Sequence, residues 1–182
     1  TWTTRFVPLL MNAVAAREGT LPVYMFGFSA GGQFVARTTA FESLPNVVRI
    51  VGGGASTYVL PKLGSYPSGE AAPYGMGMLS SMGQTELTQY LGKPYSIIVG
   101  SEDTDTTDPN LSVTDAAMRQ GTQRLDRAQK TFALANTVAA QRANMFGWDL
   151  FVVPGVGHSA SQILRSKELQ EAMRLPNPAA LN

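Results

Sequence analysis

The chain has 182 residues, enough for one domain whose core buries roughly 70% of the surface that the unfolded chain exposes. Charged residues make up 15% and the formal net charge is +1, so the chain lacks the basic surface that nucleic acid or an anionic membrane would demand. There is no cysteine and His158 is the only histidine, which excludes disulfides and the usual ligand set of a zinc site. No apolar run approaches the roughly 18 residues of a membrane span.

The chain opens with a predicted helix. Apolar residues recur at helical spacing over residues 6–14, with Thr3 or Thr4 as the N-cap and Gly19 as the stop. A short apolar run at residues 23–26 follows and predicts a buried strand.

Residues 27–31 read Gly-Phe-Ser-Ala-Gly, which matches the G-x-S-x-G pattern of a nucleophile elbow. The pattern alone is weak evidence in a glycine-rich chain, but the strand before it and the predicted helix at residues 30–41 give it the required setting. In such an elbow a tight turn lifts the serine hydroxyl clear of the sheet. Ser29 is therefore a candidate nucleophile; the simpler alternative is that it only caps the following helix.

A second buried strand is predicted at residues 47–52, and the pattern then changes. Residues 55–94 are rich in proline, glycine, tyrosine and methionine, and we expect an irregular, lid-like excursion over the carboxyl ends of the strands, with a short helix at about 85–91. Tyr58, Tyr74 and Met76, together with Phe28 beside the elbow, are candidates for an apolar substrate pocket. The alternative is that these side chains fill a small core under the loop.

In the second half of the chain, predicted strands and helices again follow one another in turn. A strand at residues 95–99 leads into an acidic loop at 100–109, and Ser112 with Asp115 marks a helix start. Gly121 interrupts this helix, which then continues to about residue 144. A strand at 149–153, a glycine-rich loop ending at His158 and a last amphipathic helix follow, and the tail at 176–180 should be loose.

Alternating strands and helices predict an α/β protein with a parallel sheet and helices on both faces, formed by residues 1–182 as a single domain. Ser29, an aspartate after the third predicted strand and His158 after the fourth would then lie at one edge of the sheet. A serine hydroxyl needs a base, and the base needs an orienting carboxylate. The acidic loop offers Asp103, Asp105 and Asp108 as that carboxylate.

Three stretches, VYMFGFSAGG, IIVGSEDTD and VVPGVGHSA, resemble the elbow, acid loop and histidine loop of α/β-hydrolases. The sequence is most similar to bacterial serine esterases of the depolymerase-like kind. The resemblance implies Ser29 as nucleophile and His158 as general base and then acid. It implies Asp103 as orienting acid, because the family often has Gly-x-x-Asp here, with Asp105 as runner-up and Asp108 third.

The resemblance implies a serine hydrolase that cleaves carboxylic esters, small or polymeric, through an acyl-enzyme intermediate, without cofactor or metal. The family normally has several strands before the elbow, and a loop after one of them supplies an oxyanion-hole amide. Here the backbone N–H of Ala30 is one candidate donor and a second donor has no candidate. We therefore expect a carboxyl-terminal portion of the fold without its N-terminal strands, the other half being a separate chain or a segment outside this sequence.

Three alternatives stay open. The chain could be a non-catalytic binding or assembly piece of a hydrolase scaffold, because a fold does not guarantee activity. Thr1 could act as an N-terminal nucleophile with its own amine as base. Residues 155–160 imitate the GxGxxA fingerprint of a dinucleotide site, although no further strand with an acidic residue follows.

Overall fold

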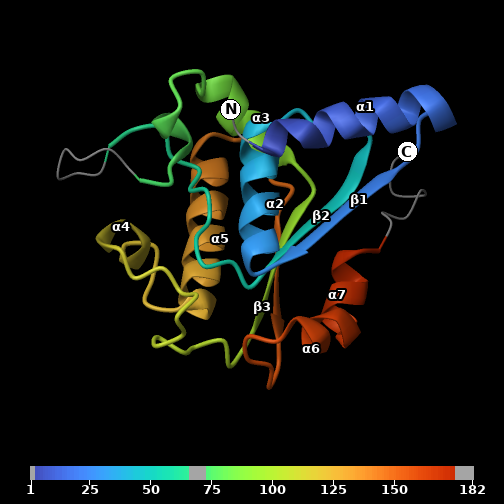
Figure 1. Ribbon diagram of the computed structural model, residues 1–182. Helices are drawn as coiled ribbons and strands as arrows, with labels where there is room; N and C mark the ends of the chain where they lie inside the picture. Colours follow the sequence, from blue (N-terminus) through green and yellow to red (C-terminus); the bar gives the residue numbers. More distant parts are fainter. Residues whose placement is uncertain (1–2, 66–72, 175–182) are drawn as a thin grey trace.

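The computed structural model describes residues 3–65 and 73–174. Within them a sheet of four parallel strands forms the centre, and its order β1-β2-β3-β4 follows the chain (Figure 1). All carboxyl ends of the strands therefore point to the same edge of the sheet. The strands are β1 (Val23–Phe28), β2 (Val47–Gly53), β3 (Tyr95–Gly100) and β4 (Asp149–Val153).

Helical segments precede and connect the strands, as parallel pairing requires a crossover between neighbours. The longest is α5, which leads into β4, and α2 connects β1 to β2. The α-helices are α1 (Phe6–Glu18), α2 (Ala30–Phe41), α3 (Gln84–Gly92), α4 (Asp115–Met118), α5 (Arg124–Gln141), α6 (Ala160–Arg165) and α7 (Lys167–Ala172), and two 3-10 helices, η1 (Thr3–Arg5) and η2 (Met76–Met78), join them.

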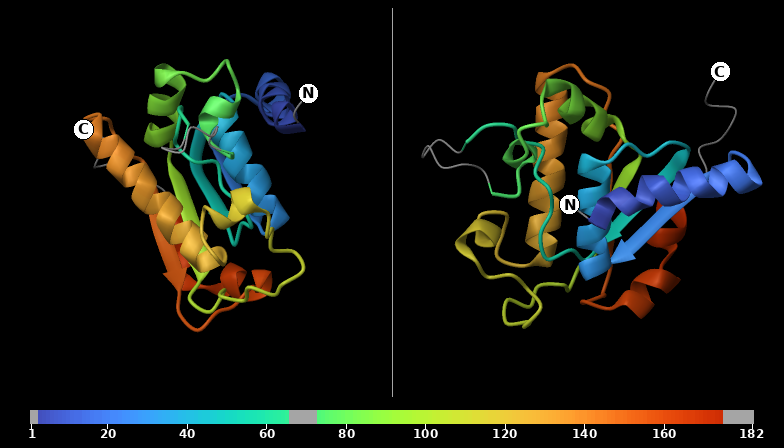
Figure 2. Two further views of the ribbon diagram at one scale, coloured as in Figure 1. Left: turned by 90° about the vertical axis from the view of Figure 1, so that its left-hand side faces the viewer. Right: turned by 45° about the horizontal axis from the view of Figure 1, so that its top comes forward.

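Helices cover both faces of the sheet, which confirms the predicted α/β architecture. Successive side chains of a strand point to opposite faces, and here Ile50 and Ile97 pack in a core with α2, α3 and α5. Val51 and Ile98, one position further along each strand, pack in a second core with α6 and α7. Helices α2 and α5 thus belong to the same layer, and both are visible in the right-hand view of Figure 2.

Several predicted helix boundaries are wrong in detail. The threonines expected to cap α1 lie in η1, and Arg5 takes the N-cap position with a helical backbone and no capping side-chain bond. The helix expected from Ser112 begins later, with Thr114 as the N-cap of α4. The last helix is divided at Ser166, whose hydroxyl caps α7.

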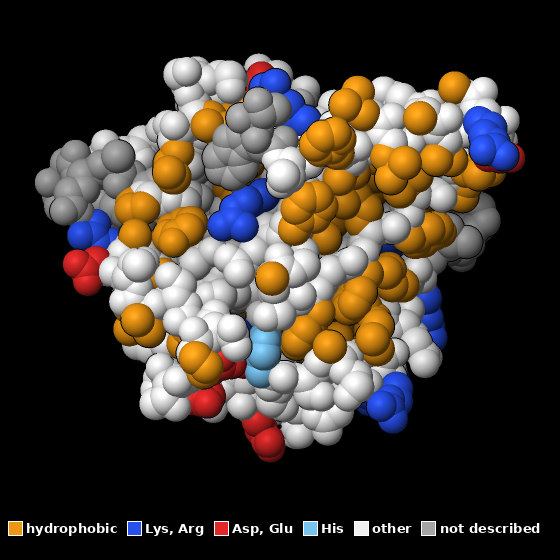
Figure 3. Space-filling view, viewed as in Figure 1, with side chains coloured by type: hydrophobic (Ala, Val, Ile, Leu, Met, Phe, Trp, Pro, Cys, Tyr) orange, Lys and Arg blue, Asp and Glu red, His pale blue; other side chains and the backbone are white. Residues whose placement is uncertain are grey.

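Strand β1 forms an edge of the sheet as described, and an apolar surface lies beside it. Helix α1 has no fully buried side chain, and Phe6, Leu9 and Leu10 are 69%, 62% and 66% exposed. Figure 3 shows this apolar surface over α1 and β1. The predicted apolar stripe of α1 thus exists but is left uncovered by the described residues.

Between β2 and α3 the described residues form mainly turns and bends around η2. A parallel bridge between Leu60 and Gly75 joins two stretches within this segment. Residues 66–72 of the expected excursion, the tail at 176–180 and Thr1 lie outside the described residues. None of the described helices has the length and apolar character needed to cross a membrane.

Candidate active site

Ser29 lies in a strained turn between β1 and α2. Its φ of 56° and ψ of −116° are unusual for a residue with a side chain. The backbone N–H of Ser29 donates to the carbonyl of Gly53 at 2.8 Å, which holds the turn against the end of β2. The Ser29 hydroxyl makes no capping bond to α2, so the alternative of a simple helix cap does not hold in this structure.

The glycines around Ser29 differ in what the turn demands of them. A Cβ on Gly27 would overlap the carbonyl of Gly31 and lie 2.8 Å from Val35 Cγ2. A Cβ on Gly32 would overlap the carbonyl of Gly53, so α2 crosses β2 at backbone contact. A Cβ on Gly31 would meet nothing within 4 Å. Close packing therefore explains the first glycine of the motif and not the second.

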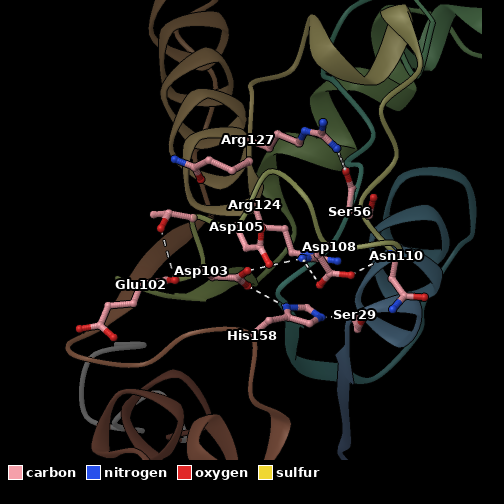
Figure 4. Close-up of polar contacts among 12 residues, drawn as sticks. Ser29, Ser56, Glu102, Asp103, Asp105, Asp108, Asn110, Arg124, Arg127 and His158 are labelled. Atoms are coloured by element: carbon pink, nitrogen blue, oxygen red, sulfur yellow. Dashed lines mark hydrogen bonds and ion pairs between the residues drawn. The ribbon is translucent and has the colours of Figure 1, made fainter.

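The side chains of Ser29, His158 and Asp103 form one hydrogen-bonded row (Figure 4). His158 Nε2 lies 3.0 Å from Ser29 Oγ, and His158 Nδ1 lies 2.8 Å from Asp103 Oδ2. An ionised carboxylate can only accept hydrogen bonds. A neutral imidazole therefore carries its proton on Nδ1 and leaves Nε2 to accept the serine proton.

Backbone bonds between two loops bring Asp103 and His158 together. The N–H of Ser101 donates to the carbonyl of Val153 at 2.9 Å, and the N–H of Glu102 donates to that of Val156 at 2.9 Å. A Cβ on Gly100 would overlap the Val156 carbonyl, so a larger residue would force these loops apart. The end of the sheet thus fixes the spacing between carboxylate and imidazole.

Burial differs along the row. The Asp103 side chain is 1% exposed, whereas that of His158 is 22% exposed. The ring of Phe28 packs against the imidazole with the ring centroids 4.8 Å apart. Figure 3 shows the histidine at the surface, next to the apolar area over β1 on one side and to acidic side chains on the other. The imidazole edge is therefore open to an incoming molecule.

The other two candidate acids have no hydrogen bond to His158, although Asp108 lies near enough for the two charges to interact. Asp105 is exposed and accepts hydrogen bonds from the N–H and hydroxyl of Thr107, both at 2.7 Å, and these bonds lower its pKa. Asp108 accepts from the N–H of Asn110 at 2.7 Å, the main reason for its lowered pKa, and from the Arg124 guanidinium at 2.9 Å.

Arg124 is the part of this site that the sequence reasoning missed. Its Nη1 lies 2.9 Å from Asp108 Oδ2 and 3.6 Å from Asp103 Oδ1 (Figure 4). The side chain is 0% exposed. The signal that could have found it is a basic residue in the first turn of a helix, where the helix dipole disfavours a positive charge.

The candidate pocket residues lie in different surroundings. Tyr58 and Met76 are core residues with 2% and 0% exposure, so neither is open to a ligand in this structure. Tyr74 is half-buried with φ of 64°, and its N–H donates to Met78 Sδ. Of the four, only Phe28 is shown in contact with the Ser29–His158–Asp103 row. Among residues 3–65 and 73–174, no three acidic or histidine side chains group so as to hold a metal ion.

Ala30, the candidate oxyanion donor, is the first residue of α2. The first N–H groups of a helix have no acceptor within that helix, so the Ala30 amide is available beside Ser29. The amide of Ser29 itself is already bonded to Gly53.

Two solved structures share the fold over most of this chain. The LpqC poly(3-hydroxybutyrate) depolymerase from Bordetella parapertussis matches with 32% identity and a TM-score of 0.75, covering 99% of this chain and 61% of that chain. Poly(aspartic acid) hydrolase-1 from Sphingomonas sp. KT-1 matches with 30% identity and a TM-score of 0.76, covering 92% and 62%. No family model and no curated protein matches the sequence. The chain spans about three fifths of these two proteins, one a depolymerase and the other a hydrolase by name, and it shares their fold.

Proposed function

We propose that this chain carries the catalytic centre of a serine hydrolase that cleaves carboxylic esters through an acyl-enzyme intermediate. The observation that carries the proposal is the row from Ser29 through His158 to Asp103, with distances of 3.0 Å and 2.8 Å. The strained backbone of Ser29 and the two hydrolase neighbours support it.

In the first step His158 Nε2 takes the Ser29 proton while Oγ attacks the ester carbonyl carbon. Asp103 holds the imidazole in the required tautomer and stabilises the imidazolium that forms. The tetrahedral oxyanion accepts a hydrogen bond from the Ala30 N–H. The C–O bond to the leaving group breaks as His158 returns the proton to the departing alcohol.

In the second step water attacks the acyl-serine ester. His158 takes a proton from the water and then returns one to Ser29 Oγ as the carboxylic acid leaves. The same three side chains therefore serve both halves of the reaction, and no cofactor enters it.

The surroundings of the row favour a neutral substrate. Glu102 and Asp105 are exposed on the acid loop next to His158, so an approaching polyanion would meet like charges. Phe28 and the apolar surface over β1 lie on the other side of the imidazole. Of the two neighbours' named substrates, the polyester poly(3-hydroxybutyrate) suits these surroundings better than the polyanion poly(aspartic acid).

The exposed edge of β1 is the place from which a second oxyanion donor could come. Ser29 directly follows this strand, and the apolar side chains of α1 beside it are exposed. We propose that further polypeptide, in the same or another chain, covers this edge and places a second amide near Ala30.

The test is hydrolysis of p-nitrophenyl butyrate compared with the matching p-nitroanilide. We expect ester turnover that Ser29→Ala abolishes, and a much slower reaction with the amide. Ester turnover that survives Ser29→Ala would contradict the proposal. The non-catalytic alternative predicts no turnover with either substrate, but the 3.0 Å contact between Ser29 and His158 removes its main geometric ground.

A further inference from the structure

Arg124 carries a positive charge where local rules disfavour one. It is the first residue of α5, at the positive end of the helix dipole, and its side chain is 0% exposed. Its Nε and Nη2 have no hydrogen-bond acceptor among the described residues. Unmet donors and buried ion pairs are poor sources of stability. A residue that breaks several local rules is a candidate for a functional role.

The contacts of Arg124 lead directly to the row. Asp103 uses Oδ2 for His158, and its buried Oδ1 has no hydrogen bond among the described residues. The Arg124 Nη1, 3.6 Å from Oδ1, supplies the opposite charge on that side. The N–H of Leu125 donates to the Asp103 carbonyl at 3.2 Å, so the loop is fastened to the same turn of α5.

We propose that Arg124 is a positioning residue for the hydrolysis. This rests on the proposed function. The guanidinium, shared between Asp103 and Asp108, holds the Asp103 carboxylate aimed at His158 and places a positive charge near the imidazole, which disfavours a second positive charge on the ring. Asp108 tunes the effect by neutralising part of the guanidinium charge at 2.9 Å.

The other groups that face this cluster are neutral, bonded elsewhere or exposed to solvent. Tyr58 stays neutral, because burial raises its pKa. Arg127, also on α5, donates to the backbone carbonyls of Ser56, Gly121 and Ser112, which indicates a structural role. Ser29 and Phe28 on the remaining side of the imidazole carry no charge, and Glu102 and Asp105 are exposed to solvent.

The experiment follows the titration of His158 by NMR and the pH profile of kcat/KM for ester hydrolysis. His158 is the only histidine, so its ring signals need no assignment. Arg124→Gln leaves two carboxylates facing the imidazole, which favours the protonated ring. We expect the titration midpoint and the acid limb to move up by about 1 pH unit. Asp108→Asn removes one of the two carboxylates beside the Arg124 guanidinium, so the titration midpoint and the acid limb should both move down by about 0.5 unit.

Shifts of the His158 titration midpoint in opposite directions in Arg124→Gln and Asp108→Asn would indicate charge coupling. A purely structural role of Arg124 would lower activity at all pH values without moving the acid limb of the pH profile. Arg124→Lys keeps the charge and should restore most of the wild-type profile. Asp105→Asn removes a carboxylate of the same loop and should leave both readouts unchanged. Asp108→Asn retains the buried arginine and so tests the coupling even if Arg124→Gln does not fold.

The proposed role of Arg124 would be overturned if the His158 titration midpoint did not move in Arg124→Gln and Asp108→Asn, or if it moved in the same direction in both. The NMR titration needs no turnover, so this outcome is separate from the fate of the proposed function. Ester hydrolysis that persists in Ser29→Ala would overturn the proposed function, whatever the titration shows.

Discussion

At the scale of single residues, surroundings separate two aspartates that are two positions apart. Asp103 is buried and contacts His158, whereas Asp105 is exposed and bonded to Thr107. An orienting acid must accept a hydrogen bond from the Nδ1–H group, and of the two aspartates only Asp103 lies at hydrogen-bond distance from His158 Nδ1. The two carboxylates are chemically the same, so their positions relative to His158 decide which of them can orient the imidazole.

We therefore expect Asp103→Asn to lower kcat for ester hydrolysis by about 10⁴-fold, because the amide favours the wrong imidazole tautomer. Asp105→Asn is the matched control and should change kcat less than about twofold. Equal losses in the two variants, measured by steady-state kinetics at saturating substrate, would contradict the assignment.

The sequence could predict some residues of the candidate site and not others. The order of strands and loops indicates that an aspartate of the 100–109 loop and the lone histidine lie close together, and the structure brings Asp103 and His158 together. The preference for Asp103 over Asp105 and Asp108 came from the resemblance to α/β-hydrolases and not from the spacing itself. Arg124 could not be found in this way, because its contacts depend on how α5 meets the loop after β3, about twenty residues earlier. For Tyr58 and Met76 the sequence leaves both a substrate pocket and a core under the loop open, because composition cannot distinguish the two; the structure places both side chains in the core.

At the scale of elements, the turn between β1 and α2 depends on Gly27 far more than on Gly31. A methyl group at Gly27 would overlap the Gly31 carbonyl and crowd Val35, whereas one at Gly31 would enter open space. Gly31 also lies inside α2, where alanine is favoured over glycine.

Gly27→Ala should lower the free energy of unfolding by about 1–3 kcal/mol and reduce ester turnover, since the elbow must shift. Gly31→Ala should leave turnover largely intact and raise the free energy of unfolding by up to about 1 kcal/mol. Urea unfolding of both variants checks this. A Gly31→Ala variant as destabilised as Gly27→Ala would refute the packing argument.

The sequence predicted every strand and most helices, because apolar runs and breaks by glycine or proline are local signals. Helix ends were less predictable, because several polar residues near an end can serve as the cap. Thr114, and not Ser112, caps α4, and Ser166 caps α7 in the middle of the expected last helix. The exposed apolar side of α1 could not be foreseen either, because periodicity shows that a stripe exists and not what covers it.

At the scale of the whole molecule, Lys93 links α2 to β3. Its Nζ donates to the carbonyls of Thr39 and Glu42 at 2.6 Å and 2.8 Å, at the carboxyl end of α2. Burial lowers the pKa of Lys93 from 10.5 to about 8, against a smaller opposing effect of the Glu42 charge. Between these two values the unfolded chain binds more protons at this site than the native protein.

The contribution of Lys93 to stability should therefore rise with pH between about 8 and 10.5 and stay constant below that window. Urea unfolding of the wild type and Lys93→Gln at pH 7.0, 8.5 and 9.5 measures it, since groups common to both proteins cancel. The difference in unfolding free energy should move in favour of the wild type as the pH rises. A difference independent of pH would contradict the burial argument.

In the proposed hydrolysis Ser29, activated by His158 and Asp103, is the nucleophile. Labelling with a fluorophosphonate, followed by peptide mass spectrometry, tests it most directly, because the reagent forms a stable adduct with an activated serine and needs no knowledge of the substrate. We expect a single adduct on Ser29 that disappears in Ser29→Ala and forms much more slowly in His158→Ala. An adduct on another residue, or labelling that is unchanged in Ser29→Ala, would contradict the account.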